Sequence, residues 1–186
     1  EAWSVPLDRT LARALYTGLI FDTGGFRYSN TTPAAHLLAA RLVEAGIDSS
    51  WIAIHVLMER RIESIRLMGH VLSTARFHAN GQVAVASVSR AEIDRFGVCK
   101  GDFEGIVDLL VFTEGVEVAA LCVERDPGRA KLSLRSRAVV DVARVASSLD
   151  TGGGGHARAA GVTLSQPLDE VVALLENVLA TAVKTA

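Results

Sequence analysis

The sequence predicts an α/β protein in which a helical N-terminal segment precedes a C-terminal domain built on a mixed sheet. Apolar residues recur at three- and four-residue spacing up to Gly46, which is the period of amphipathic helices. After His78-Ala-Asn-Gly, short β-branched runs bounded by turn residues alternate with helix-like stretches. This change of pattern divides the 186 residues into a helical segment (1–48), a helical connector (49–79) and a mixed α/β domain (80–186).

Composition and charge limit the classes of function. A chain of this length with 49% hydrophobic residues can bury a sizeable core. A net charge of -2 excludes a globally basic nucleic-acid binder and leaves a local basic patch open. Cys99 and Cys122 lack CxxC spacing, which favours two buried free thiols over a disulfide or metal site. No apolar run reaches the roughly 18 residues of a membrane helix, and the first residues lack signal-peptide features. We therefore expect a cytoplasmic protein without a membrane partner.

The first 75 residues predict three helices. Leucines at positions 7, 11, 15 and 19 form one apolar stripe, and the helix should end near Asp22. Thr31 or Thr32 can cap a second helix that stops at Gly46, with Pro33 in its first turn. A third helical stretch runs from Ser49 or Ser50 to about Ala75 and would serve as the connector.

The C-terminal part predicts strands and helices in alternation. The β-branched run 82–89 reads as a strand, and two longer β-rich runs flank the turn Asp126-Pro-Gly-Arg129 as a hairpin. The ranges expected are helices 90–97, 101–115, 141–149 and 167–184, hairpin strands 116–125 and 130–137, and an edge strand 161–165.

The stretch TGGGGHARAAG raises the question of what approaches its backbone. Four glycines, 152–155, run into His156 and Arg158, and the following Ala-Ala-Gly predicts a helix start. Glycines before a helix expose backbone N–H groups at the positive end of the helix dipole, which suits a phosphate. The alternative is a flexible loop with an incidental histidine, and the glycines alone do not decide between the two.

Basic residues gather near this stretch. Between Arg125 and Arg158 there are seven basic and three acidic residues. Alternation along the predicted strand 130–137 places Lys131, Ser133, Arg135 and Arg137 on one face. Such a strip is often only a solvated strand face, but the neighbouring glycines favour the binding of an anion.

Asp22 is a further candidate because it follows an apolar run and precedes two glycines. An aspartate at the end of an element can ligate a metal or cap a turn, and one carboxylate does not hold a catalytic ion alone. The sequence contains no HxxxH or HExxH spacing that would complete a site.

Two motifs in this order and spacing resemble the DHH phosphoesterase superfamily. The stretch GLIFDTGGFRYSNTTPAAHLLAARLVEAGI is similar to the last motif of the Rossmann-like Asp-His-His catalytic domain. SLRS together with GGGGHARAAG is similar to the DHH-associated C-terminal domain. Within the superfamily, the resemblance is to the bacterial oligoribonuclease and pAp-phosphatase group. The GGGH element alone also resembles a domain of alanyl-tRNA synthetases and related editing proteins.

The resemblance implies a phosphoesterase with two Mn²⁺ ions that hydrolyses short oligoribonucleotides (nanoRNA), pAp and linear or cyclic dinucleotides to 5′-mononucleotides. It implies that Asp22 is a catalytic metal ligand, with Arg27, Ser29 and Asn30 near the metals. A homodimer is also implied. The substrate-binding residues would be Arg135, Ser136, Gly153, Gly154, Gly155, His156 and Arg158.

The 186 residues lack the superfamily's upstream motifs, including the Asp-His-His triplet. We therefore expect the C-terminal portion of a longer enzyme, which binds substrate but hydrolyses little and holds metal weakly by itself. One alternative is a stand-alone nucleotide- or RNA-binding module, which would need no catalytic-domain segment such as DTGGFRYSNTT. Another is a single-strand DNA exonuclease of the same superfamily, which would call for a further electropositive channel.

Overall fold

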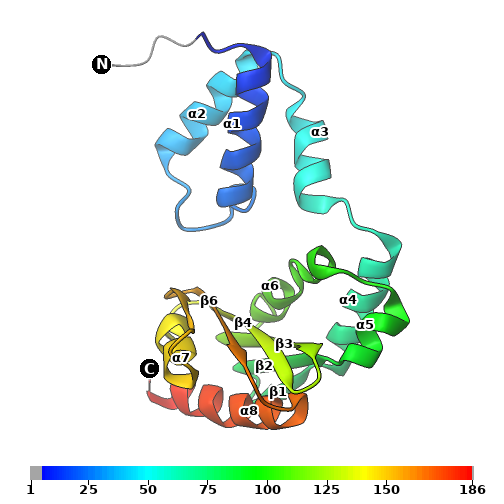
Figure 1. Ribbon diagram of the computed structural model, residues 1–186. Coiled ribbons are helices and arrows are strands. Elements are labelled where there is room, and N and C mark those ends of the chain that lie inside the picture. The colour runs from blue at the N-terminus through cyan, green and yellow to red at the C-terminus, as the bar shows by residue number, and fades with distance from the viewer. Residues whose placement is uncertain (1–5, 186) are drawn as a thin grey trace. The chain divides into compact units, whose positions relative to one another are not determined.

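The computed structural model describes residues 6–185, which form two compact units (Figure 1). The N-terminal unit ends at Arg60 and the C-terminal unit begins at Arg61. This division falls inside the stretch that was expected to be a helical connector.

The N-terminal unit is helical, as its apolar periodicity predicts. Asp8 Oδ1 accepts a hydrogen bond from the Leu11 N–H at 2.8 Å, and Thr32 caps the second helix through Ala35 in the same way. Ala12, Ile20 and Leu42 are almost completely buried in the small core between the helices. The elements are α1 (Arg9–Asp22), α2 (Pro33–Glu44), α3 (Ser49–Ala53) and the π-helical turn η1 (Ile54–Met58).

The expected continuous helix over 49–75 is wrong. Helical structure stops at Met58, because Glu59 and Arg61 have extended backbones with ψ of 131° and 153°. A separate helix, α4 (Ile62–Thr74), follows and belongs to the C-terminal unit, where Leu67 is fully buried. Arg61 anchors the start of this unit through a 3.0 Å ion pair with the buried Asp102.

The C-terminal unit is built on a six-stranded mixed sheet with strand order β1-β2-β3-β4-β6-β5. The predicted hairpin is confirmed: β3 and β4 are antiparallel, with Cys122 opposite Leu132. Only β2 and β3 are parallel among the neighbouring strands of this sheet. The strands are β1 (Arg76–His78), β2 (Val83–Val88), β3 (Val118–Asp126), β4 (Arg129–Ser136), β5 (Gly154–His156) and β6 (Ala159–Leu164).

Helices pack on both faces of the sheet, which gives two hydrophobic clusters (Figure 1). On one face, α4, α5 (Arg90–Phe96) and α6 (Ile106–Val111) cover Ala119, Leu121 and other residues of β2 and β3. On the other face, α7 (Val142–Leu149) and α8 (Leu168–Thr185) cover Leu132 and Leu134. The core of the unit therefore lies in two layers, one on each side of the sheet.

Two local expectations are wrong, and two strands were missed. The helix expected over 101–115 is split into the 3₁₀ turn η2 (Lys100–Phe103) and α6, because Gly105 has a φ of +82°. The strand expected over 161–165 does not lie at an edge, since β6 lies between β4 and β5. The edges of the sheet are β1 and β5, two strands that sequence patterning did not predict.

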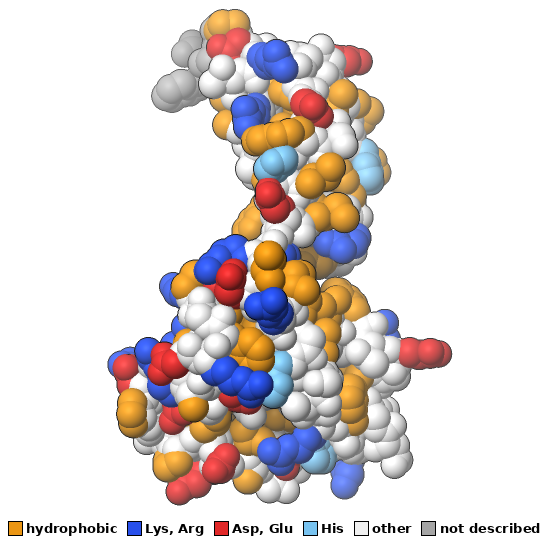
Figure 2. Space-filling view, turned by 90° about the vertical axis from the view of Figure 1, so that its right-hand side faces the viewer, with side chains coloured by type: hydrophobic (Ala, Val, Ile, Leu, Met, Phe, Trp, Pro, Cys, Tyr) orange, Lys and Arg blue, Asp and Glu red, His pale blue; other side chains and the backbone are white. Residues whose placement is uncertain are grey.

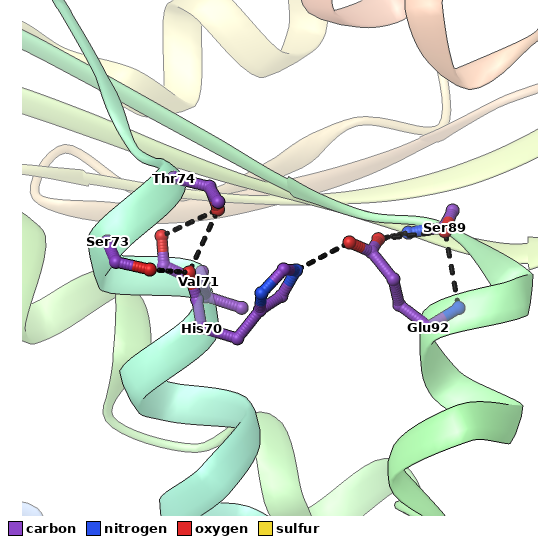
Figure 3. Close-up of polar contacts among 6 residues, drawn as sticks. All are labelled: His70, Val71, Ser73, Thr74, Ser89 and Glu92. Atoms are coloured by element: carbon purple, nitrogen blue, oxygen red, sulfur yellow. Dashed lines mark hydrogen bonds and ion pairs between the residues drawn. The ribbon is translucent and has the colours of Figure 1, made fainter.

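A polar cluster joins α4 to α5, two helices that cover the same face of the sheet (Figure 3). Glu92 and Ser89 form a capping box at the start of α5, with the Ser89 N–H donating to Glu92 Oε2 at 2.7 Å. His70 of α4 donates to Glu92 Oε1 over 2.6 Å. Burial alone would raise the pKa of Glu92, but the bonds from Ser89 and His70 outweigh it and lower the pKa. Because the glutamate lies between the serine and the histidine, the cluster is a helix-joining contact and has no activated serine nucleophile.

We predict that Glu92→Gln lowers the free energy of unfolding at neutral pH by about 1 kcal/mol, since an uncharged amide weakens the capping box. Folding lowers the pKa of Glu92, so its stabilising contribution is complete above the ordinary value of 4.5 and is lost as the pH falls through the lower folded-state value. Urea unfolding over a descending pH series should show the difference between the two proteins shrinking below this range. Glu114→Gln, at an exposed position, serves as the control. A deficit of Glu92→Gln that does not change with pH would contradict the prediction.

Candidate functional site

Arg135 and His156 lie in one row across three strands of the sheet. Arg135 of β4 is opposite Ala159 of β6, and Ala159 is opposite His156 of β5. Side chains that face each other in antiparallel strands project from the same face of the sheet. The fold therefore places the guanidinium and the imidazole on one face, with only an alanine methyl group between them.

A second and a third row extend this face along β4. Ser133 is opposite Gly161, which is opposite Gly154, and Lys131 is opposite Thr163. The expected grouping of Lys131, Ser133 and Arg135 on one strand face is confirmed by this register, whereas Arg137 lies beyond the end of β4. The open face is defined here as the side of β4, β6 and β5 formed by Lys131, Ser133, Arg135, Ala159, Gly161, Thr163, Gly154 and His156.

The open face is polar and accessible, in contrast to the same side of β3. Ala119 and Leu121 are buried beneath the helices, whereas His156 and Thr163 are exposed and the Arg135 side chain retains 32% of its exposure. The view of the C-terminal unit in Figure 2 shows Lys and Arg side chains interspersed with acidic and hydrophobic ones. This distribution agrees with the net charge of -2, and any attraction for an anion must be local.

The glycine run does not precede a helix, so the expected helix-dipole site is wrong. Gly154–His156 form β5, and Ala159 and Ala160 enter β6, because their backbones pair with those of β5 and β4. The preceding helix α7 ends at Leu149. No row of free N–H groups at a helix start is therefore formed by residues 152–161.

The glycines of the run have different roles. A Cβ on Gly153 would collide with the Ala146 carbonyl of α7, and one on Gly155 would lie 2.5 Å from the Ala159 oxygen. Gly155 also has a φ of +145°, which L side chains rarely adopt. Gly154, in contrast, has no heavy atom within 4 Å of the position of a Cβ. Two glycines are thus required by the protein's own packing, and Gly154 leaves free space above the open face.

The Arg135 side chain is held by two hydrogen bonds. Its Nε donates to Asp108 Oδ1 of α6 at 2.9 Å, and its Nη1 donates to the Leu134 carbonyl at 3.1 Å. Asp108 retains 26% of its side-chain exposure. Sequence analysis did not identify Asp108, although a single acidic residue inside the apolar run IVDLLV was a signal that could have found it.

Ser136 and Arg158 are brought together, but not with the open face. Alternation points Ser136 to the opposite side of β4, where it is buried and donates to the Val140 carbonyl at 2.6 Å. Arg158 Nη1 donates to the same carbonyl at 3.2 Å. Both side chains therefore hold the loop after β4, and their part in substrate binding stays a prediction.

Glu117 completes this loop. Its Oε1 accepts hydrogen bonds from three successive backbone N–H groups, those of Ala138, Val139 and Val140, at 2.6–3.0 Å. Burial alone would raise the pKa of Glu117, but these bonds and the charge of Arg158 lower it. An anion-binding turn thus exists beside the open face, and the protein's own carboxylate fills it.

Asp22 is the last residue of α1, and it is exposed. The Asn30 amide donates to its Oδ2 at 2.9 Å and to its carbonyl at 3.0 Å, so two predicted site residues meet here. Arg27 Nε instead donates to the Gly24 carbonyl at 2.6 Å, and Ser29 is exposed. These contacts hold the Asp22 carboxylate at the helix end, facing solvent.

The residues that the structure describes do not make a metal centre by themselves. No group of three or more His, Cys, Asp and Glu side chains that could hold an ion occurs among residues 6–185. Asp22 and the Asn30 amide are too few ligands for a two-manganese site. Sequence reasoning was also wrong about Cys99, which is exposed, whereas Cys122 is buried and its pKa is raised to about 12 by burial.

A separate pocket of about 380 Å³ lies around α5 and η2, and it includes none of the predicted site residues. Its lining includes Arg90, Lys100, Phe103 and Arg125. Within residues 6–185, no helix is both long and apolar enough to cross a membrane.

Comparisons with known proteins agree with the motif analysis. A family model described as the DHHA1 domain matches residues 80–184. The chain is 36% identical over 154 residues (83% of the chain, 45% of the relative) to "Bifunctional oligoribonuclease and PAP phosphatase NrnA" of Thermus thermophilus. It is 25% identical over 173 residues (92% of the chain, 53% of the relative) to the Bacillus subtilis protein of the same name.

A solved structure has the same fold. An exopolyphosphatase-related protein from Bacteroides fragilis is 30% identical, with a TM-score of 0.87 over 94% of this chain and 51% of that protein. The chain thus spans about half the length of the curated relatives that it matches. By its DHHA1 match and these relatives, the chain belongs to the DHHA1 domain family, in the DHH-superfamily group that includes the oligoribonuclease and PAP phosphatase proteins.

Proposed function

We propose that this chain forms the substrate-binding part of a phosphoesterase that hydrolyses short oligoribonucleotides, pAp and linear or cyclic dinucleotides to 5′-mononucleotides. The observation that carries the proposal is the row in which Arg135 and His156 face the same side of the sheet across Ala159. A guanidinium suits a terminal phosphate, and an imidazole can donate to a phosphate oxygen or contact a base. The names of the relatives, which include oligoribonuclease and PAP phosphatase, support this class of substrate.

In this proposal the open face recognises one end of a short substrate. Arg135 binds the terminal phosphate at one end of the row, and His156 contacts the adjoining nucleotide at the other end. Gly154 allows the ligand to approach the backbone, since no heavy atom lies within 4 Å of the place of its missing Cβ. Gly153 and Gly155 contribute by holding β5 against α7 and β6. Ser136 and Arg158 contribute by ordering the loop after β4.

The N-terminal unit, in the same proposal, is part of the catalytic domain. Its Asp22 supplies one carboxylate ligand to a manganese centre that other ligands complete, with Arg27, Ser29 and Asn30 nearby. Large apolar side chains on this unit remain exposed, including Phe21 at 63% and Leu37 at 70%, as expected of a surface that packs against further protein. A homodimer and a cytoplasmic location complete the proposal.

The relatives' names also bear on the alternatives. They describe oligoribonucleases and PAP phosphatases, so they favour this substrate class over a stand-alone binding module or a single-strand DNA exonuclease. The Asp22–Asn30 pair points the same way, because a simple binding module has no need for a carboxylate held at the end of α1.

The first prediction of this proposal concerns substrate binding. The intact chain should bind pAp and the dinucleotide pApA, and Arg135→Ala and His156→Ala should each weaken binding by about tenfold or more, as expected for the loss of a charge-assisted bond. Calorimetric titration measures these affinities. Arg144→Ala, an exposed substitution on α7, which packs on the opposite side of the sheet, removes the same charge as a control. Equal losses in all three variants would show that net charge, and not the row, determines binding.

The glycines provide a second prediction, in which stability and binding separate. Gly155→Ala should lower the free energy of unfolding by at least about 1 kcal/mol, because its φ of +145° and its contact with Ala159 oppose a side chain. Gly154→Ala should leave stability nearly unchanged and weaken binding of pAp, since its methyl group would stand on the open face. Thermal unfolding and titration of both variants check this pair. Full affinity in a stable Gly154→Ala protein would place the nucleotide elsewhere.

The third prediction concerns the metal. Mn²⁺ should bind the intact chain weakly, Asp22→Asn should weaken it further, and manganese-dependent hydrolysis of pApA should be very slow. Electron paramagnetic resonance measures the free ion directly. Glu44→Gln, an exposed substitution in the same unit, provides the control for lost charge. Identical manganese binding by Asp22→Asn and Glu44→Gln would exclude Asp22 as a ligand.

A further inference from the structure

The Arg135 guanidinium is oriented without any ligand. Of its five N–H groups, that on Nε is bonded to Asp108 and one on Nη1 is bonded to the Leu134 carbonyl. The remaining three belong to Nη1 and Nη2, and no further hydrogen bond from them occurs among residues 6–185. The two occupied N–H groups fix the plane of the guanidinium and leave its Nη1–Nη2 edge for an anion.

Asp108 is well placed to provide this orientation because its own backbone is immobilised. It lies in the first turn of α6, and its neighbours Ile106, Val107 and Leu110 are at most 4% exposed against the sheet. The helix packs on both β3 and β4, the strand that carries Arg135. The carboxylate therefore approaches Arg135 from a rigid element, and long-range packing sets the 2.9 Å contact.

We propose that Asp108 is a positioning residue that orients Arg135 for two-point binding of a terminal phosphate. This inference rests on the proposed function, in which Arg135 is the phosphate-binding residue. A planar guanidinium binds two phosphate oxygens through parallel N–H groups only when its plane is aligned with them. By holding Nε, Asp108 prevents rotation of the side chain and reduces the entropy lost when the phosphate binds.

The opposing effect of charge makes the proposal testable. The negative charge of Asp108 partly cancels that of Arg135, so a purely electrostatic effect would make phosphate binding stronger when Asp108 is removed. Loss of orientation would have the opposite effect and weaken phosphate binding, since a freely rotating Arg135 binds phosphate less well. The direction of the change in affinity therefore distinguishes the two effects.

Titration of the intact chain with pAp is the experiment. We expect Asp108→Ala to weaken binding about tenfold. Asp108→Asn should restore most of this loss, because its amide oxygen can still accept from Nε. Glu114→Ala, an exposed substitution in the turn after α6, should bind as the intact chain does. Unchanged or stronger binding by Asp108→Ala would overturn the proposal.

A double-mutant cycle excludes a general structural effect. If Asp108 acts through Arg135, then Asp108→Ala should have no further effect on affinity in an Arg135→Ala protein. Additive losses would show that Asp108 contributes by another route and would overturn the proposal.

A measurement without nucleotide separates this inference from the proposed function. In nitrogen-15 NMR, the Arg135 Nε–H should exchange slowly with water in the intact chain and in Glu114→Ala, and rapidly in Asp108→Ala. Failure of the intact chain to bind pAp would contradict the proposed function, and the exchange rate would still decide whether Asp108 holds Arg135. Rapid exchange in the intact chain would overturn the positioning role in either case.

Discussion

The register of β4 between β3 and β6 determines which side chains enter the core of the C-terminal unit and which lie on the open face. Leu132 and Leu134 are fully buried on one face, and Ser133 and Arg135 lie on the other. A shift of one residue would exchange the two sets, exposing leucines that each contribute about 2 kcal/mol when buried and moving an arginine into an apolar core. The same register sets the row in which Arg135 and His156 face the same side of the sheet.

Topology explains why this side is covered over β2 and β3, is partly covered over β4 by α6, and is open over β6 and β5. A parallel pair such as β2 and β3 needs a crossover connection, and here the crossover contains α5 and α6, which pack on the open-face side of that pair. The strands β3 and β4 are joined by a tight turn, as are β5 and β6, while α7 packs on the opposite side. No element of the connections after β3 is therefore available to cover the open face.

Patterns that depend on neighbouring residues were mostly predicted well, and long-range pairing accounts for the misses around the open face. Periodicity and caps gave α1, α2 and α8, and alternation gave the hairpin and the common face of Lys131 and Arg135. Pairing with two strands instead places the helix-prone Ala159 and Ala160 in β6. The residue Asp108 stands out in the run IVDLLV, but its pairing with Arg135 could not be predicted, because the two are 27 residues apart and the helix of Asp108 is positioned by the core.

The glycine run shows why side chains, and not backbone N–H groups, must supply the attraction for an anion. Gly153 and Gly155 are required by contacts with α7 and β6, and Gly154 offers only open space. With no helix dipole behind the run, little positive potential comes from the backbone itself. The anion-binding turn formed by the N–H groups of residues 138–140 is already filled by the Glu117 carboxylate. In the proposed function, affinity for phosphate on this face therefore depends on Arg135 and His156, and so on the direction in which the guanidinium is held.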